Sequence, residues 1–338
     1  MLSDIVNGSG IPLVERLKLP WHFLVASYLA RQLMLQNIQH LHIHFAHTPT
    51  SVGMYGAMMA GIRYSFMGHA NDLFQRAALL KEKVERSAFS ACISHHNKRW
   101  LSERGCDESK LHIVRCAIDT GQYSFRFLER SEGPLNIVSV ARLVEKKGII
   151  YLIEALDELR RGGVEFRCRI VGDGPLYEEL AHAVSSRGLE EEVELTGSLQ
   201  QEEIQDMLRE AHVFVLPCIV DSQGDQDGIP VALMEAMALG VPVISTPVSG
   251  IPELIESESS GLLVQPKDSL GLAEAIARMD RDDQLRAHLA EGARSKIESE
   301  FDLSHNVEKL YQLITDALNR FPETTSKERP AATESGSE

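Results

Sequence analysis

The 338-residue chain has few cysteines, no excess of basic residues and no long apolar run free of charge. Its five cysteines are scattered and form no C-x-x-C pair, which argues against a disulfide framework or a structural zinc site and favours a reducing compartment. The net charge of −15 argues against nucleic acid, whose phosphates need a basic surface. No signal peptide is recognisable, and the apolar run at 19–30 is too short for a membrane span. These absences predict a cytoplasmic protein.

The charge is unevenly distributed along the chain. Residues 1–133 hold 15 Lys and Arg against 11 Asp and Glu, a net of +4, whereas residues 134–338 hold 19 against 38, a net of −19. The basic first part is compatible with peripheral contact at the anionic inner face of a membrane, where each Lys or Arg contributes about 1 kcal/mol. Ordinary charge variation between two domains explains the same numbers equally well.

Strand and helix signals alternate along the chain, which is long enough for two domains. In the second half, apolar strands with helical patterns after them are expected at 135–140, 166–171, 213–216 and 241–245. Such alternation predicts a parallel sheet with helices on both faces. The first half alternates less regularly and includes a helix expected over 75–88. We predict two Rossmann-like α/β domains, 1–133 and 134–300, facing a cleft at the carboxyl ends of their strands.

The C-terminal segment is expected to consist of one helix and a tail. A helical pattern over 303–319 predicts a C-terminal helix within 301–321. The segment 322–338 is rich in Ser, Thr, Glu and Pro, and is expected to be disordered.

The most informative segment runs from an acidic loop into an apolar helix. Glu235 is the only charged residue between Gly228 and Ser249, and Pro230 fits the first turn of a helix. Asp227 and Glu235 are eight positions apart, roughly 12 Å if the spacing is helical, which is too far to flank one glycosidic bond as in a retaining hydrolase. The spacing suits an extended ligand such as a nucleotide-diphosphate sugar, with an anion facing the helix start. A buried helix whose Glu bonds a neighbouring backbone group is the alternative.

Two cations at a strand-to-helix turn are the second signal. Arg142 and Lys147 lie near a helix start, where the helix dipole disfavours cations, so an anionic ligand such as a diphosphate explains them better than a solvated surface does. The glycine turns that include Gly174 and Gly197 each follow a strand. A glycine turn alone is a weak signal, since many strand-to-helix turns use glycine.

Histidines cluster on one strand of the first half. His40, His42 and His44 share a face at strand spacing, and three imidazoles on one face can bind zinc. Nothing else in the chain favours a metal enzyme, so no metal site is predicted. His69 follows the next strand and forms a His-x-x-Asp motif with Asp72; a lone histidine at a strand end usually has a structural role.

Three motifs together resemble the retaining glycosyltransferase family 4: the acidic pair with Asp227 and Glu235, the Arg-x4-Lys pair with Arg142 and Lys147, and the His69 motif. The first half, through the segments at 45–50 and 113–119, looks most like members of the family that build bacterial exopolysaccharide or colanic acid. The resemblance implies a GT-B fold with His69, Asp227 and Glu235 as catalytic residues. It implies that His69 and Asp227 contact the donor sugar, that Glu235 binds the ribose, and that Arg142 and Lys147 bind the pyrophosphate. It also implies a donor site lined by Gly174, Gly197, Leu199, Gly228, Ile229 and Pro230.

The resemblance further implies an activity. The chain is expected to be a metal-independent hexosyltransferase that moves a sugar, with retention, from a nucleotide-diphosphate sugar to a glycan or lipid-linked acceptor of cell-surface polysaccharide biosynthesis. The donor is a substrate, and no cofactor or metal is expected.

Two departures from the family pattern keep other functions open. Asp227 stands where the family has a longer Glu, and only about forty residues precede the strand at 40–45, none with the family's opening glycine loop. We therefore expect a first domain shortened at its N-terminus. A non-catalytic nucleotide-sugar-binding or scaffold protein, or a nucleotide-sugar epimerase on the same fold, remains an alternative.

Overall fold

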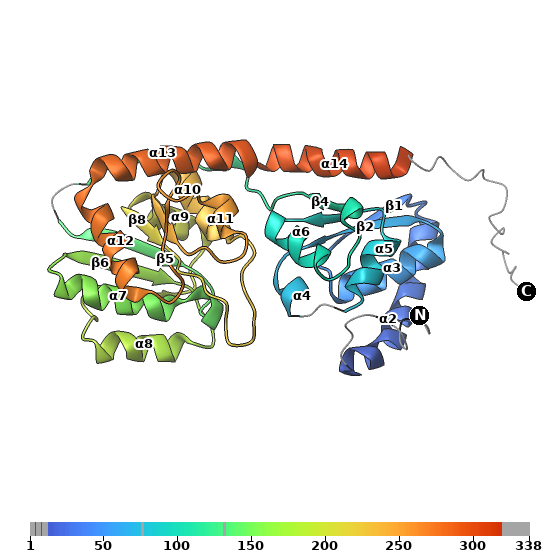
Figure 1. Cartoon of the computed structure of the whole chain (residues 1–338), viewed down its shortest axis with the longest axis horizontal. Coiled ribbons are helices and arrows are strands. Elements are labelled where there is room, and N and C mark those ends of the chain that lie inside the picture. The colour runs from blue at the N-terminus through green and yellow to red at the C-terminus, as the bar shows by residue number, and fades with distance from the viewer. Residues whose placement is uncertain (1–3, 5–7, 9–12, 76–77, 131–132, 320–338) are drawn as a thin grey trace, which may run out of the picture.

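The chain folds into two α/β lobes, each built on one parallel sheet (Figure 1). The computed structural model describes residues 4, 8, 13–75, 78–130 and 133–319. The tail expected over 322–338 lies outside the described residues. Within the described part, no helix is both long enough and apolar enough to cross a membrane.

The first lobe has a four-stranded sheet in the order β1-β2-β3-β4. Its strands are β1 His40–His44, β2 Arg63–Gly68, β3 Ser90–Cys92 and β4 Leu111–Ile113. Its helices are α2 Leu13–Leu35, α3 Thr48–Ala60, α4 Asn71–Phe74, α5 Leu80–Arg86 and α6 His95–Ser102. All pairs are parallel, and each connection between neighbouring strands carries a helix, as parallel pairing requires.

The prediction of a single helix over 75–88 is wrong. α4 ends at Phe74 and α5 begins at Leu80, because Leu79 adopts a left-handed backbone with φ of 58° that no α-helix accommodates. The Leu79 side chain is fully buried in the lobe's core, so packing supports the strained backbone.

α2 contacts the lobe through one face only. Leu19, Ala26 and Leu33 are buried, and α2 packs chiefly against α3. The opposite face exposes large apolar side chains in a row along the helix, each between 62% and 75% exposed: Leu17, Trp21, Leu24 and Tyr28. A helix that is apolar on all sides normally has partners on more than one face.

The second lobe has a six-stranded sheet in the order β10-β9-β8-β5-β6-β7. Its strands are β5 Leu135–Val140, β6 Phe166–Val171, β7 Val193–Gly197, β8 Val213–Val215, β9 Val243–Ser245 and β10 Leu262–Leu263. Its helices are α7 Ile149–Arg161, α8 Tyr177–Ser186, α9 Gln201–Arg209, α10 Val231–Leu239, α11 Ile251–Leu254, α12 Ser269–Arg281 and α13 Asp283–Glu300. β5 pairs with both β6 and β8, so the strand order reverses beside β5 and a ligand crevice is expected there.

The C-terminal helix α14, Leu303–Asn319, returns to the first lobe. α13 and α14 run end to end along both lobes (Figure 1). Ala317 on α14 is buried in a cluster with Met67, Phe89 and Ala91 of the first lobe, so a helix from the end of the chain completes that lobe's core.

Within the described residues the chain therefore passes between the lobes twice, and the two connecting segments are hydrogen-bonded to each other. The Ile118 N–H donates to the Phe301 carbonyl at 3.0 Å, and the Leu303 N–H donates to the Ile118 carbonyl at 2.9 Å. These backbone bonds join the segment after β4 to the junction between α13 and α14.

Candidate functional site

The loops after β5, β6 and β8 pack tightly against one another at the carboxyl ends of their strands. A Cβ at Gly148, where φ is 67°, would lie 2.0 Å from the Pro217 carbonyl oxygen. A Cβ at Gly174 would lie 2.4 Å from the Leu143 carbonyl oxygen. Both glycines therefore permit a close approach of backbones that a side chain would prevent.

A cluster of opposite charges lies where these loops meet. The Lys147 Nζ is 2.5 Å from Asp227 Oδ2, and the Lys146 Nζ is 3.5 Å from Asp227 Oδ1 and 3.0 Å from Asp225 Oδ2. The side chains of Lys147 and Asp227 are only 15% and 13% exposed. Burial alone would lower the pKa of Lys147, but the adjacent Asp227 carboxylate outweighs it and raises that pKa. The sequence indicates Lys146 only as a solvated neighbour of Lys147; this is wrong, because the Lys146 side chain is 15% exposed and belongs to the same cluster.

Arg142 differs from the lysines. Its side chain is exposed, and it forms no ion pair with any described residue. The planar fork of donors on its guanidinium therefore has no ion-pair partner among the described residues.

Glu235 on α10 is half-buried and bonds two side chains from other elements. Its Oε1 accepts from the Tyr123 hydroxyl at 3.0 Å and from Gln201 Nε2 at 2.9 Å. Burial and the Glu235 carboxylate raise the pKa of Tyr123 to about 12, so the phenol stays a hydrogen-bond donor at neutral pH. The alternative prediction, in which Glu235 bonds a neighbouring backbone group, is wrong, because its partners are the side chains of Tyr123 and Gln201.

The remaining glycine-turn residues lie around this end of the sheet. Gly197 adopts φ of 71°, and its carbonyl accepts from the Gly172 N–H at 2.8 Å. Leu199 is half-buried just before α9, the helix that carries the Gln201 side chain bonded to Glu235. Ile229 is buried, and Pro230 immediately precedes α10.

His69 lies at the end of β2 with both ring nitrogens near other side chains. Its Nε2 is 3.3 Å from His44 Nδ1, and its Nδ1 is 3.5 Å from Cys116 Sγ. Burial lowers the pKa of His69. Asp72 accepts from the backbone N–H groups of His69 and Ala70, so this carboxylate organises the turn and does not contact the imidazole ring by hydrogen bond.

The histidines of β1 are engaged with a serine. His40 Nε2 and His42 Nδ1 are each 2.7 Å from Ser65 Oγ. Burial lowers the pKa of both histidines to about 4. Among the described residues, no group of three His, Cys, Asp or Glu side chains is placed to hold a metal ion.

The two lobes meet directly at these residues. A Cβ at Gly228 would lie 2.5 Å from Ile93 Cδ1 and 3.3 Å from the His69 carbonyl oxygen, so the loop with Asp227 lies against the first lobe. The Asn71 side chain donates to Asp225 Oδ2 at 3.1 Å across the same boundary. The loop that carries Asp227 and Gly228 thus lies against the His69 backbone of the first lobe. A separate group of side chains lies on the second lobe, where Glu235 bonds Tyr123 and Gln201.

Comparison with known proteins accounts for both halves of the chain. The family model described as "Glycosyl transferases group 1" matches residues 123–296, and the model described as "Glycosyltransferase Family 4" matches residues 3–122.

Curated relatives include two from bacterial polysaccharide biosynthesis. The chain is 43% identical over 203 residues to the putative colanic acid biosynthesis glycosyltransferase WcaL of Escherichia coli, a match that covers 60% of this chain and 50% of the relative. It is 40% identical over 258 residues to the amylovoran biosynthesis glycosyltransferase AmsK of Erwinia amylovora, covering 75% of this chain and 62% of the relative. The matched part therefore spans about half to three-fifths of these relatives' length.

Solved structures have the same fold at low identity. Anabaena Alr3699/HepE in complex with UDP superposes with a TM-score of 0.75 at 17% identity, covering 86% of this chain and 82% of that one. Sucrose-phosphate synthase from Thermosynechococcus elongatus superposes with a TM-score of 0.77 at 18% identity, covering 92% and 81%. Like these two-lobed structures, the chain pairs two parallel-sheet α/β lobes, as expected.

Proposed function

Because the chain belongs to the group 1 glycosyl transferases and has the GT-B fold, we propose that it transfers a sugar from a nucleotide-diphosphate sugar to a glycan or lipid-linked acceptor. We place this reaction in bacterial exopolysaccharide biosynthesis, because the names of the two relatives describe colanic acid and amylovoran biosynthesis. Anabaena Alr3699/HepE, a structural neighbour, forms complexes with UDP and with UDP-glucose, which supports a nucleotide-sugar donor.

The observation that carries the proposal is the Lys147–Asp227 ion pair next to Gly228, which packs against the His69 backbone where the two lobes meet, together with Glu235 bonded to Tyr123. We propose that the diphosphate binds Arg142 and Lys147, with Lys146 adding charge nearby. We propose that Glu235 binds the ribose hydroxyls. The sugar then lies toward Asp227 and His69, where the two lobes meet.

The glycine turns fit the same assignment. Turns without side chains let a ligand approach the backbone closely, and helix starts present N–H groups to anions. We propose that the donor is lined by Gly174, Gly197, Leu199, Gly228, Ile229 and Pro230.

We propose a reaction with retention and without a protein nucleophile or a metal. The bond between the sugar C1 and the diphosphate oxygen breaks, and a bond from the acceptor oxygen to C1 forms on the same face. The proton of the acceptor hydroxyl passes to the departing diphosphate, so atoms and charge balance. Arg142 and Lys147 stabilise the negative charge that develops on the diphosphate, the task that a metal ion performs in other enzymes.

We propose that the enzyme acts in the cytoplasm at the inner face of the membrane, where a lipid-linked acceptor lies. The exposed face of α2 supports this placement, because it carries Trp21, Tyr28 and leucines. Between Arg16 and Leu35 the helix has cations and no acidic residue, in a chain whose net charge is −15. Apolar and aromatic side chains with flanking cations are typical of helices that lie in a membrane interface.

A non-catalytic nucleotide-sugar-binding protein is the second candidate. One observation favours it: Asp227 already neutralises Lys147, the residue assigned to the diphosphate. A binding protein needs only affinity, whereas a transferase must also position an acceptor.

The test is a thermal-shift screen with UDP, GDP and ADP and their sugars in the presence of EDTA, followed by an assay for released nucleotide with and without an extract of lipid-linked acceptors. A ligand at about 100 times its Kd raises stability by roughly 2.7 kcal/mol, which is readily seen. Nucleotide released only with acceptor supports the transferase. Binding without release supports the second candidate, inversion of the sugar on the nucleotide indicates an epimerase, and no shift with any ligand contradicts the donor site.

A further inference from the structure

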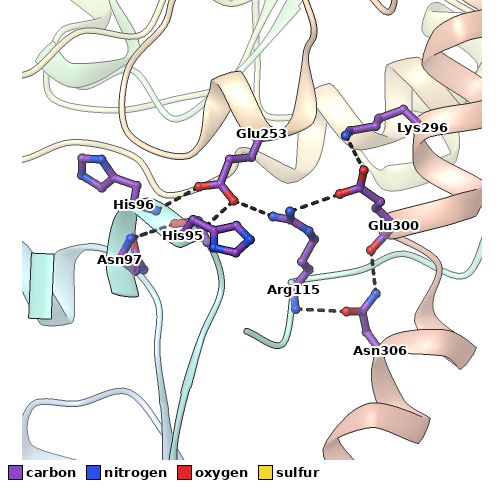
Figure 2. A network of polar contacts seen from close by, with 9 residues as sticks. His95, His96, Asn97, Arg115, Glu253, Lys296, Glu300 and Asn306 are labelled. Carbon is purple, nitrogen blue, oxygen red and sulfur yellow. Dashed lines mark hydrogen bonds and ion pairs between the residues drawn. The ribbon is translucent and has the colours of Figure 1, made fainter. Parts of the chain in front are cut away.

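Glu253 of the second lobe bonds the first lobe at three points (Figure 2). Its Oε2 accepts from the His95 N–H and from Arg115 Nη1, both at 2.9 Å, and its Oε1 accepts from the His96 N–H at 2.9 Å. His95 and His96 form the first turn of α6, whose N–H groups have no partner within the helix. A carboxylate from α11 therefore satisfies the start of a helix in the other lobe.

Arg115 is held rigidly on its far side. Its Nη2 is 3.1 Å from Glu300 Oε2, its guanidinium lies over the Phe301 ring, and its backbone N–H donates to Asn306 Oδ1 at 3.0 Å. The side chain is only 12% exposed. An exposed ion pair contributes little, but here the guanidinium has several fixed partners and little water around it.

Helix α6, which Glu253 bonds at its start, also contacts the candidate site. Asn97 on α6 donates from Nδ2 to the His69 carbonyl oxygen at 2.5 Å. The same oxygen would lie 3.3 Å from a Cβ at Gly228. The backbone of His69 is thus enclosed between α6 and the loop that carries Asp227.

The packing of α11 on α6 leaves little freedom. A Cβ at Gly250, which immediately precedes α11, would lie 3.0 Å from Ser94 Cβ. Ser94 is the residue that caps α6, and its Oγ accepts from the Asn97 N–H at 3.1 Å. α11, the start of α6, Asn97 and the His69 carbonyl therefore form one continuous set of contacts.

We propose that Glu253 is a positioning residue that couples the approach of the two lobes to the placement of His69. When the lobes separate, Glu253 loses the N–H groups of α6, and α6 is then free to shift with Asn97 and the His69 backbone. When the lobes are together, the carboxylate fixes α6 and so sets His69 against the Gly228 peptide. The importance of His69 rests on the proposed function; the coupling itself does not.

The experiment compares Glu253→Ala and Glu253→Gln with the wild type, and Glu258→Ala serves as the matched control. Glu258 lies five positions away and pairs with Arg278 at 2.5 Å wholly within the second lobe. Small-angle X-ray scattering measures the radius of gyration. NMR measures the titration midpoint of the His69 imidazole, assigned with His69→Asn; Asp72, His44 and Cys116 are the titratable groups near this ring.

We expect Glu253→Ala to enlarge the radius of gyration and to raise the His69 midpoint by about half a pH unit, since a displaced imidazole gains water. Glu258→Ala should match the wild type in both. A Glu253→Ala protein with wild-type scattering and an unchanged His69 midpoint overturns the proposal, and so does an open protein in which the His69 midpoint does not move.

Arg115→Lys keeps the proposal testable if the Glu253 variants do not fold. Lysine retains the charge but cannot bond Glu253 and Glu300 together as the guanidinium fork does. We expect a smaller change of the same sign in both measurements, and no change in either contradicts the proposal. Neither measurement needs a donor or an acceptor, so a failure of the proposed function leaves the result interpretable.

Discussion

The Lys147 ammonium lies 2.5 Å from the Asp227 carboxylate, so the cation assigned to the donor's diphosphate is already paired with the acid assigned to its sugar. A diphosphate and Asp227 therefore compete for the same charge. Binding of the donor should displace the carboxylate from Lys147 and release it toward the sugar.

Asp227→Asn tests this competition. Without the competing carboxylate, we expect UDP to bind about tenfold more tightly, which corresponds to roughly 1.4 kcal/mol. UDP-sugar should gain less, because it also loses the contact between Asp227 and the sugar. Isothermal titration calorimetry checks both affinities. Asp206→Asn on the exposed surface of α9 controls for the change in net charge, and weaker UDP binding in Asp227→Asn would contradict the competition.

Arg142 should contribute more to diphosphate binding than Lys147. Arg142 has no ion pair within the described residues and offers a planar fork, whereas Lys147 is a point charge partly compensated by Asp227. We expect Arg142→Ala to raise the Kd for UDP roughly 30-fold and Lys147→Ala to raise it by a smaller factor. Each variant should lose no more than a few kcal/mol of binding free energy. Arg167→Ala, on an exposed position of β6, is the matched control. Equal affinity in Arg142→Ala and wild type would remove Arg142 from the site.

Glu235 should recognise ribose hydroxyls, and Tyr123 should hold it in place. We expect Glu235→Gln to bind UDP more weakly but 2′,3′-dideoxy-UDP with nearly unchanged affinity, because the analogue lacks the groups that Glu235 is assigned to bind. Tyr123→Phe should also reduce the preference for UDP over 2′,3′-dideoxy-UDP, but by a smaller factor, since it removes only one hydrogen bond to Glu235 Oε1. Competition binding with the two ligands gives the ratio. An unaltered ratio in Glu235→Gln would rule out the ribose assignment.

The half-buried histidines of β1 should make the first lobe sensitive to acid. The pKa values of His40 and His42 are about 4 in the folded protein, against an ordinary value of 6.5. Between these values the unfolded chain binds protons that the folded chain does not, so the free energy of unfolding falls as pH decreases from 6.5 toward 4 and is unaffected by these groups above 6.5. Urea titrations across this window should show a shallower dependence in His42→Leu. His182→Leu on α8, an exposed histidine, should keep the wild-type slope.

The exposed face of α2 should bind anionic bilayers. We expect the full chain to sediment with vesicles that contain phosphatidylglycerol and much less with neutral phosphatidylcholine vesicles, because both the cations and the apolar side chains contribute. Trp21→Ser with Leu24→Ser should reduce the bound fraction several-fold, whereas Val307→Ser on the exposed side of α14 should not. Association of the chain with itself through α2, detected by analytical ultracentrifugation and lost in the same double variant, would replace the membrane as the occupant of this face.

The sequence was most predictive where the signal is local. The apolar run at 135–140 became β5 with the same bounds, and the helical pattern over 303–319 became α14 from Leu303 to Asn319. Hydrophobic periodicity reports which side of an element is buried, and this needs no knowledge of the rest of the chain. The interrupted helix at Leu79 was missed because its left-handed backbone depends on packing and not on a local glycine.

The site was less predictable because its contacts join distant parts of the chain. Glu235 bonds Tyr123, which lies 112 positions away, and Arg115 bonds Glu253, which lies 138 positions away. Tyr123 stands in no motif that marks it, and the sequence around Arg115 is compatible with a side chain that faces either the cleft or the surface. Lys146 adjoins the motif residue Lys147, but only the approach of the Asp225 loop gives it a partner.

The paired backbone bonds at Ile118 have a mechanical consequence. Two connecting segments that are hydrogen-bonded side by side can serve as a single hinge between the lobes. Rocking about this hinge keeps the bonds that Ile118 makes with Phe301 and Leu303, whereas sliding or twisting of one segment past the other would break them. We therefore expect opening and closing of the lobes to follow mainly this rocking motion. We expect such a motion to return the Gly228 loop to the same position on the first lobe each time the lobes close.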